Sequence, residues 1–355
     1  MDKNFFIISW NHHHIPLKYR ELLSLDKDNV KKFIRLALEH SSISEISVLS
    51  TCNRIEVHAI SHDIDKVLGI VKSIYGMIIH QELNWEKYKP KVFANLDAFK
   101  HLCLVASGFN SMAFGESQIT LQVKSAQNFL LNSQPNAKTL DSFYENALMC
   151  SNKIRLRFSS VLEPVSVSGL IIEKIKVIGK SLDDLSVLIL GAGESASLTA
   201  KLFKKHCAEQ IFIANRNTDK SAYLSKKIDG SYIPIDEISD TLLVCDVLVT
   251  ATHSDKYLID KNLIEGVMIK RKENLLLFDI SSPRNIDPSI SEIDDVLLYD
   301  LDSLKIDSFY DMHEKKFMIN SALDIIEKYF IDNIDISGVE EIEIDYLHLD
   351  EVGAV

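Results

Sequence analysis

Long apolar runs are absent from this sequence. Neither its first residues, MDKNFFIISW, nor any later window approaches the ~20 apolar residues that cross a membrane. Its five cysteines are widely spaced and form no CxxC pair, which argues against a disulfide framework and a structural zinc site. Internal repeats are also absent. From these absences we expect a soluble, cytoplasmic protein without a membrane segment.

Charge and length set further limits. At 355 residues, the chain is longer than one typical core and predicts two domains with an appendage. Residues 1–157 carry 19 Lys+Arg and 15 Asp+Glu, whereas the remainder carries 20 and 36. The last 24 residues, from Asp332 on, contain eight acids and no Lys or Arg. A polyanion would therefore dock on the N-terminal part and be repelled elsewhere.

The N-terminal part mixes strand and helix patterns. Short apolar or alternating runs predict strands at FFIISW, EISVLS and IEVHAI, and helical spacing marks 28–40 and 64–79. From about Asp97 to Phe158 the pattern is helical, with a Gly/Ser-rich break at 107–117 and long helices at 119–132 and 139–157. These patterns predict an α+β domain over residues 1–158.

The pattern changes after that domain. A helix at 166–178 leads into strands that alternate with helices, and the strand sequences are SVLIL, QIFIAN, VLVTAT, LLLFDI and VLLYDL. This alternation predicts a doubly wound parallel sheet of Rossmann type over residues 159–306. A helix at about 307–331 and an acidic tail complete a third segment, 307–355. The predicted fold class is multidomain, α/β and α+β.

One turn in the second domain matches GxGxxG/A. It follows a strand and opens a helix, and a second strand comes at the expected distance, which is the context that dinucleotide binding requires. The first Gly permits the turn, the second lets the backbone approach a pyrophosphate, and the small last residue allows helix and strand to pack closely. A Rossmann-like fold with an empty site is the alternative. The predicted cofactor turn consists of Gly191, Ala192, Gly193, Glu194, Ser195 and Ala196.

The end of the second strand separates the two nicotinamide cofactors. An acid there would bind a ribose 2′-hydroxyl and repel a 2′-phosphate. The sequence has Asn215-Arg216-Asn217 instead, with no carboxylate until Asp219. Arg216 can offer a charge-assisted fork to a phosphate, or it is a solvated surface charge. The pattern favours NADPH.

Cys52 lies in a polar turn between two predicted strands. Its neighbours are Thr51, Asn53 and Arg54, and a cation beside a thiol stabilises the thiolate. Cysteine is otherwise commonly a small buried hydrophobe. On chemistry alone, Cys52 is either a nucleophile or an incidental residue.

Two strings resemble a known family. STCNRIEVHAI (50–60) and GFNSMAFGESQITLQVKSA (108–126) are similar to the two characteristic segments of glutamyl-tRNA reductase, and NHHHIP, IFIANRN and DISSPRNIDP also fit that family. The similarity extends over about residues 5–330. It implies NADPH-dependent reduction of glutamyl-tRNA(Glu) to glutamate-1-semialdehyde, the first step of five-carbon tetrapyrrole synthesis.

The resemblance also implies roles for individual residues. Cys52 would attack the ester between glutamate and its tRNA, and hydride from NADPH would reduce the resulting thioester. His101 would act as an acid–base or positioning group, with a core histidine as the alternative. Arg54 and Glu116 suit the carboxylate and the ammonium group of the amino acid. The implied glutamate contacts are Thr51, Asn53, Arg54, Ser111, Glu116, Ser117, Gln118 and Gln122.

Partners follow from the same resemblance. Glutamyl-tRNA(Glu) would be the substrate, and glutamate-1-semialdehyde aminotransferase is a candidate to receive the product. The family forms homodimers through a C-terminal helical domain; most of that domain is absent from this sequence, so the resemblance leaves a homodimer open. Two other functions are weighed against this one: an NADPH-dependent oxidoreductase related to shikimate dehydrogenase, which needs no Cys52, and a non-catalytic protein that binds tRNA or another partner.

Overall fold

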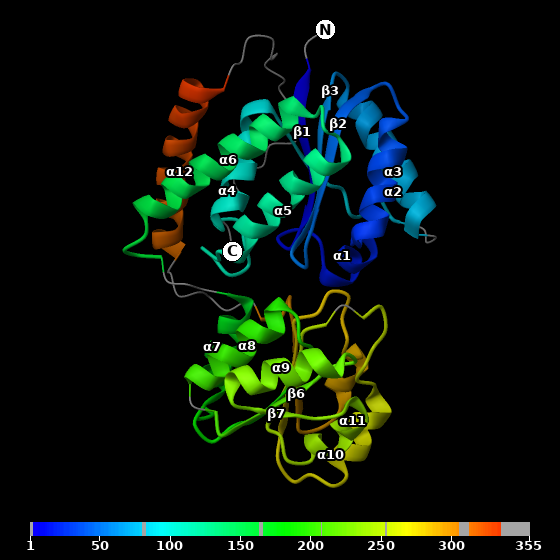
Figure 1. The fold of residues 1–355 in the computed structure, drawn as a ribbon, viewed down its shortest axis with the longest axis vertical. Coiled ribbons are helices and arrows are strands. Elements are labelled where there is room, and N and C mark those ends of the chain that lie inside the picture. Colours follow the sequence, from blue (N-terminus) through cyan, green and yellow to red (C-terminus); the bar gives the residue numbers. More distant parts are fainter. Residues whose placement is uncertain are drawn as a thin grey trace. The chain divides into compact units, whose positions relative to one another are not determined.

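The chain divides into two compact units. The computed structural model describes residues 3–79, 83–162, 166–206, 208–252, 254–304 and 312–334. The first unit runs to residue 165 and includes the C-terminal helix α12, and the second unit is Ser166–Ile306 (Figure 1). The predicted helix start at 307 and most of the acidic tail lie outside the described residues.

An antiparallel sheet forms the centre of the first unit. Its strands, in the spatial order β2-β3-β1-β4, are β2 (Ile43–Ser50), β3 (Arg54–Ser61), β1 (Asn4–Asn11) and β4 (Lys91–Ala94). The strands β2 and β3 form a hairpin in which Ser50 pairs with Ile55, so only three residues, 51–53, connect them. The long central pair β1 and β3 aligns Asn11 with Arg54 at the same end.

Helices cover both faces of this sheet (Figure 1). Alternate apolar residues of β3, such as Ile55 and Val57, pack in one cluster with Phe33 and Tyr75 of the first helices. The opposite face packs against the later helices, where Phe5 of β1 stacks on Phe143 at 4.4 Å. The helices of the unit are α1 (Leu17–Leu23), α2 (Lys27–Leu38), α3 (Ile64–Ile79), α4 (Asn95–Ser107), α5 (Gln118–Ser133), α6 (Lys138–Arg157) and α12 (Met312–Asn333).

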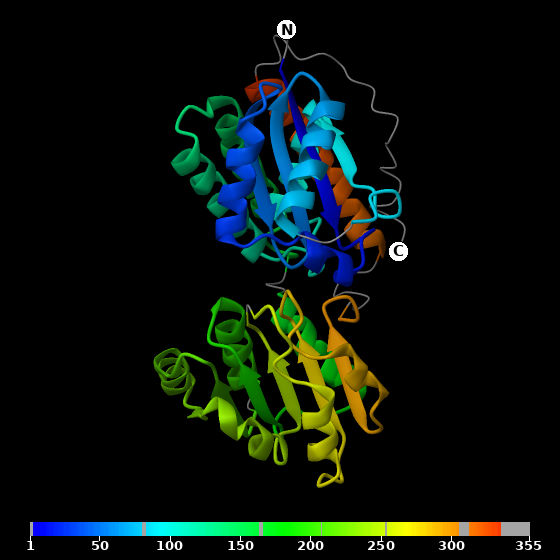
Figure 2. The same cartoon turned by 90° about the vertical axis from the view of Figure 1, so that its right-hand side faces the viewer.

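A six-stranded parallel sheet forms the centre of the second unit (Figure 2). Its strands, in the spatial order β7-β6-β5-β8-β9-β10, are β7 (Ser231–Tyr232), β6 (Gln210–Ala214), β5 (Ser186–Leu190), β8 (Val247–Thr250), β9 (Leu275–Asp279) and β10 (Val296–Asp300). From β5 the chain adds β6 and β7 on one side and then β8, β9 and β10 on the other, so the strand order reverses between β5 and β8. Such sheets bind ligands at the carboxyl ends of the strands beside this point.

In the described part of the second unit, five α-helices accompany these strands: α7 (Val167–Ile178), α8 (Glu194–Lys205), α9 (Thr218–Ile228), α10 (Ile238–Leu242) and α11 (Lys261–Met268). The parallel, doubly wound sheet and the α+β first unit confirm the predicted fold class. Within the described ranges, no helix combines the length and the apolar character needed to cross a membrane.

Candidate active site

Cys52 lies at the tip of the β2–β3 turn. Thr51 closes this turn: its backbone N–H donates to the Arg54 carbonyl at 2.8 Å. Its Oγ1 accepts the N–H groups of Asn53 at 3.2 Å and Arg54 at 3.1 Å. Thr51, predicted to contact glutamate, therefore shapes the turn that presents the thiol.

Arg20 of α1 fixes the same turn from a distant part of the sequence. Its Nε donates to the Cys52 carbonyl at 3.3 Å, and its Nη1 donates to the Ile15 carbonyl at 2.7 Å. The side chain is completely buried. Arg20 was not predicted from the sequence, because a basic residue in a seven-residue helix carries no local sign of this contact.

Glu116 reaches the site on the loop between α4 and α5. Gly108 ends α4 with φ +83°, and a Cβ there would clash with the carbonyl of Glu116. Arg155 of α6 donates from Nη1 to the carbonyls of Ser107 and Gly115 at 3.0 Å and of Glu116 at 3.3 Å. The close approach of Gly108 to Glu116 and the hydrogen bonds of Arg155 thus fix the conformation of this loop.

The electrostatics of the thiol differ from the sequence-based expectation. Burial and the Glu116 carboxylate raise the pKa of Cys52 to about 11, although Arg20 and Arg54 act in the opposite direction. The neighbouring cations thus favour the thiolate as predicted, but in the free protein burial and the acid outweigh both arginines. Burial also raises the pKa of Glu116 to about 7, against the effect of Arg54.

Arg54 is completely buried at the start of β3. Its Nη1 donates to Glu56 Oε1 at 3.1 Å, and its Nη2 donates to the backbone carbonyl of Asn110. Its Nε has no hydrogen-bond partner within the described part of the chain. The guanidinium therefore joins the Cys52 turn to the loop that carries Glu116.

The remaining predicted substrate residues lie around these two segments. Asn53 is buried, and its Oδ1 has no partner among the described atoms. Ser111 is buried within the α4–α5 loop, whereas Ser117 is exposed as the N-cap of α5. Gln118 and Gln122 follow on the first two turns of that helix, and both are half-buried.

His101 lies on α4 and is buried. Its Nε2 is 2.7 Å from Glu56 Oε1, and its ring stacks on Phe93 with centroids 4.2 Å apart. Of the three consecutive histidines near the start, His13 contacts Asn110 Oδ1 at 2.9 Å, and His14 contacts Asn11 Oδ1 at 3.1 Å. Each of these two rings thus has a hydrogen bond with an amide side chain.

The predicted cofactor turn joins β5 to α8. Gly191 has φ +131°, and a Cβ there would clash with the Ala251 carbonyl. Gly193 is the N-cap of α8, and a Cβ there would meet nothing within 4 Å. Ala196 is completely buried one turn later. The open space beside the helix N-terminus, which Glu194 and Ser195 begin, fits a pyrophosphate held by backbone N–H groups.

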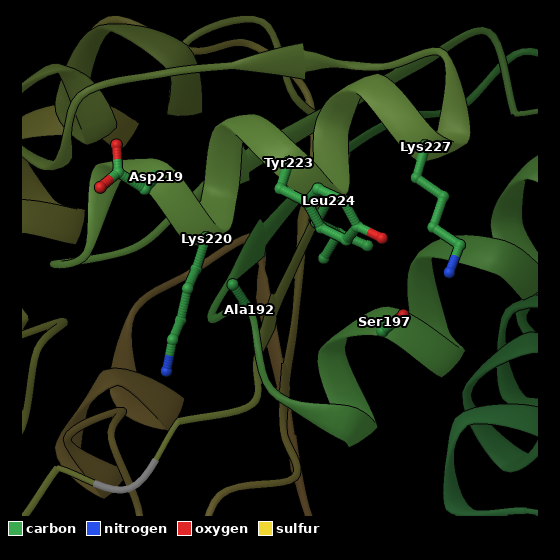
Figure 3. A pocket seen from close by; sticks show the side chains of 7 residues that line it. All are labelled: Ala192, Ser197, Asp219, Lys220, Tyr223, Leu224 and Lys227. Carbon is green, nitrogen blue, oxygen red and sulfur yellow. The ribbon is translucent and has the colours of Figure 1, made fainter.

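The end of β6 lies near a cavity of about 390 Å³. Asn217 caps α9 by accepting the Lys220 N–H at 3.0 Å, and Asn215 donates to the Asn217 carbonyl at 3.2 Å. Arg216 is exposed. Lys220 was not predicted from the sequence as a cofactor residue. It lines this cavity together with Ala192 (Figure 3). The cavity is lined by Ala192, Ser197, Asp219, Lys220, Tyr223, Leu224 and Lys227 (Figure 3).

Asp279 organises the loop that follows β9. Its Oδ1 accepts from Thr250 Oγ1 at 2.7 Å, and its Oδ2 accepts the N–H groups of Asn285 at 2.7 Å and Ile286 at 2.8 Å. The carboxylate is buried. The DISSPRNIDP segment is therefore built around an internal carboxylate at the carboxyl edge of the sheet.

Comparison with known proteins follows this division into two units. Residues 8–157 match the family described as glutamyl-tRNAGlu reductase, N-terminal domain, and residues 173–306 match the family described as shikimate / quinate 5-dehydrogenase. The glutamyl-tRNA reductase of Carboxydothermus hydrogenoformans is 32% identical over 316 residues, which are 89% of this chain and 70% of that protein.

A second relative agrees with this result in sequence. A glutamyl-tRNA reductase of Desulfitobacterium hafniense is 31% identical over 314 residues, or 87% of this chain and 69% of that protein. The solved structure of the Methanopyrus kandleri glutamyl-tRNA reductase is 24% identical, with a TM-score of 0.49, over 92% of this chain and 79% of that one. On the sequence comparisons, this chain belongs to the glutamyl-tRNA reductase family.

Proposed function

We propose that this protein reduces glutamyl-tRNA(Glu) to glutamate-1-semialdehyde with NADPH, through a thioester on Cys52. The observation that carries the proposal is the convergence of Cys52, Arg54 and Glu116, from two segments separated in sequence, in a member of this family. The reaction is the first step of five-carbon tetrapyrrole synthesis.

Cys52 supplies the nucleophile. Its Sγ attacks the carbonyl carbon of the aminoacyl ester, a carbon–sulfur bond forms, and the bond to the ribose oxygen breaks. The thiol proton leaves with the ribose hydroxyl. After reduction, the carbon–sulfur bond breaks, the sulfur regains a proton, and the aldehyde is released.

Glu116 links substrate binding to activation of the thiol. Its carboxylate raises the pKa of Cys52 in the free protein. An α-ammonium group bound at Glu116 would compensate this negative charge, so that Arg20 and Arg54 would then favour the thiolate. The thiol is thus least reactive in the free protein and becomes more reactive when the correct amino acid is present.

The other substrate contacts surround this pair. Asn53 offers an unpartnered Oδ1, and Arg54 has N–H groups left beyond its two protein bonds. The α4–α5 loop and the start of α5 supply further hydroxyl and amide groups for the glutamyl side chain, namely Ser111, Ser117, Gln118 and Gln122.

The second unit has a Rossmann-type fold suited to a nicotinamide cofactor. We propose that the cofactor is NADPH, because Arg216 is exposed after β6 and Lys220 lines the adjoining cavity. Both cations suit a 2′-phosphate. When bound, NADPH would supply the hydride that reduces the thioester. The residues Gly191 to Ala196 would hold its pyrophosphate at the N-terminus of α8.

Substrate and product indicate the cellular context of this proposal. Charged tRNA is a cytoplasmic substrate, and we place the enzyme there for that reason. The aldehyde product is reactive, and a glutamate-1-semialdehyde aminotransferase is the proposed recipient.

A dehydrogenase that reduces a free ketone is the competing function. The match to shikimate / quinate 5-dehydrogenase covers residues 173–306 only and leaves the thiol site unexplained. Cys52→Ser separates the two functions. With glutamyl-tRNA and NADPH, the wild type should form semialdehyde, Cys52→Ser should form none, and the buried control Cys150→Ala should retain activity. Full activity of Cys52→Ser would exclude the thioester mechanism.

A further inference from the structure

Three polar side chains alternate along β3 on one face. Arg54, Glu56 and His58 are each completely buried, whereas the intervening Ile55 and Val57 belong to the apolar cluster of the opposite face. The polar face packs against α4 and α6, and all three side chains are excluded from solvent. Buried charges at this density need paired partners.

Glu56 is the centre of this network. Its Oε1 accepts from His101 Nε2 at 2.7 Å, Ser9 Oγ at 3.0 Å and Arg54 Nη1 at 3.1 Å. Its Oε2 accepts from His58 Nε2 at 3.2 Å. Burial opposes ionisation, but His101 and Arg54 together hold the pKa of Glu56 well below its usual range. The group is therefore a carboxylate that only accepts hydrogen bonds.

His58 and Tyr144 enclose the second oxygen of Glu56. Since His58 Nε2 donates to the carboxylate, its Nδ1 accepts from the Tyr144 hydroxyl at 2.8 Å. Burial lowers the pKa of His58, which keeps the ring neutral. This side of Glu56 is thus closed by two uncharged groups.

The network connects with the candidate active site through Arg54. The guanidinium bonds to Glu56 and also to the carbonyl of Asn110, in the loop that leads to Glu116. Without Glu56, the Nη1 of this guanidinium would lose its carboxylate partner. Arg54 would then leave its bridging position and act less on the Cys52 thiol.

His101 contacts the network at Glu56 Oε1, the oxygen that also accepts from Arg54. Its Nε2 is committed to Glu56, its ring stacks on Phe93, and its side chain is only 4% exposed. These contacts fix the ring against Glu56. They suit a group that orients another residue better than one that exchanges protons with a substrate.

We propose that Glu56 and His101 are positioning residues that hold the Arg54 guanidinium between the Cys52 turn and the Glu116 loop. His101 acts through Glu56 and does not transfer a proton during the reaction. This inference rests on the proposed function for its kinetic test, and it also has a test that needs no substrate.

The decisive comparison is His101→Gln against His101→Ala. The glutamine amide can donate an N–H to Glu56 from near the position of Nε2, but it does not titrate. We expect His101→Ala to lower kcat/KM for glutamyl-tRNA by about 10²-fold, the size of effect that a small misplacement of a reacting group produces. His101→Gln should stay within about tenfold of the wild type and keep the same pH profile, since no proton transfer is lost.

A proton-transferring His101 would give another pattern. His101→Gln would then be as slow as His101→Ala, and one limb of the pH profile would disappear in both variants. That result overturns the proposal.

Glu56→Gln tests the centre of the network. It should lower kcat/KM about as much as His101→Ala, and combining the two should add little, because both act on Arg54. The buried control Tyr144→Phe keeps all three donors to Oε1 and should stay within a few-fold of the wild type. Wild-type activity of Glu56→Gln would contradict the proposal. If Glu56→Gln does not fold, the two His101 variants decide.

Alkylation of Cys52 gives the readout without substrate. Iodoacetamide labelling, followed by peptide mass spectrometry, reports the thiolate fraction, which Arg54 favours. Labelling should be slower in His101→Ala than in the wild type and should recover in His101→Gln. Equal labelling of all three proteins overturns the proposal. If the three proteins label in the expected order but the wild type forms no semialdehyde, the proposed function fails and the positioning inference stands.

Discussion

Cys52 and Glu116 are coupled because the Glu116 carboxylate lies close enough to the thiol to act on its charge. The carboxylate raises the pKa of the thiol, and burial raises the pKa of the carboxylate itself to about 7. Near neutral pH the free protein therefore has a protonated thiol beside a partly protonated acid. In the proposed cycle, binding of the substrate ammonium group favours ionisation of both the Cys52 thiol and the Glu116 carboxyl.

Removing the Glu116 charge should separate these effects. Because the pKa of Cys52 is about 11, alkylation of the wild type should rise with pH by about tenfold per unit up to that value. In Glu116→Gln the carboxylate that raises the pKa is absent, so alkylation at a fixed pH should be several-fold faster. Turnover of glutamyl-tRNA should nevertheless be slower, because the ammonium contact is lost. Alkylation no faster than in the wild type would contradict this account of the thiol.

Arg216 carries the cofactor preference at the same scale. Arg216→Ala should weaken NADPH binding by about 10–100-fold, the equivalent of one or two charge-assisted hydrogen bonds. NADH binding should change little, because NADH has no 2′-phosphate. Fluorescence titration of both cofactors measures the two affinities. Lys205→Ala is the control, since Lys205 is an exposed cation at the C-terminal end of α8 that does not line the cavity. Equal losses for NADPH and NADH would contradict the assignment.

The two glycines of the β5–α8 turn have separate tasks. Gly191 has a positive φ and faces the Ala251 carbonyl, whereas the position of a Cβ at Gly193 is open. Gly191→Ala should therefore destabilise the second unit by about 1–3 kcal/mol, through backbone strain and a clash. Gly193→Val should leave the melting temperature unchanged but weaken NADPH binding at least about tenfold, by filling the pyrophosphate space. Calorimetry and cofactor titration distinguish them, and unaltered NADPH binding in Gly193→Val would contradict the proposed site.

Local patterns predicted the long elements well and the short ones poorly. The helix predicted at 64–79 is α3, Ile64–Ile79, and the one predicted at 139–157 is α6, Lys138–Arg157. Several short elements were missed, and β4 and α1 are two of them. β4 has four residues and forms by pairing with β1, some 80 residues earlier in the chain. α1 has seven residues. Both are determined by contacts distant in sequence, which periodicity does not record.

The candidate site shows the same limit. The alternation in IEVHAI is visible in the sequence and predicts a strand with one polar face, which is commonly solvated. The structure buries this face under helices and turns Glu56 into the centre of a network. Arg20 and Arg155 were likewise missed, because each binds backbone carbonyls of a distant turn. Because every residue has a backbone carbonyl, the partners of these two arginines cannot be recognised from residue types. No sequence motif therefore indicates the contacts of Arg20 and Arg155.

At the scale of the whole molecule, the chain leaves the first unit and later returns to it. Helix α12 packs against α4 and α6, after the entire second unit has intervened. Phe330 lies 5.3 Å from Phe99 between ring centroids, and the Tyr329 hydroxyl donates to Asn146 Oδ1 at 3.2 Å. The first unit is therefore built from residues that precede the second unit in the sequence and from residues that follow it.

Phe330→Ala tests this arrangement. The loss of a buried aromatic ring should destabilise the first unit by about 3 kcal/mol. NADPH affinity should be unchanged, because the cofactor turn lies in the other unit. Calorimetry should show one transition shifted downward, and Ile331→Ala, at a side chain that is largely exposed, is the matched control. A shift of equal size in both variants would contradict the packing of α12 described here.

The central claim is that Cys52 takes glutamate from tRNA before any reduction occurs. The most direct measurement incubates the protein with glutamyl-tRNA while NADPH is withheld, and follows the intact mass and the tRNA charge. We predict deacylated tRNA and a glutamyl adduct on Cys52, or free glutamate from its hydrolysis, neither of which forms with Cys52→Ser. Adding NADPH should then yield glutamate-1-semialdehyde. If the tRNA stays charged and no semialdehyde forms with NADPH, the thioester mechanism is contradicted.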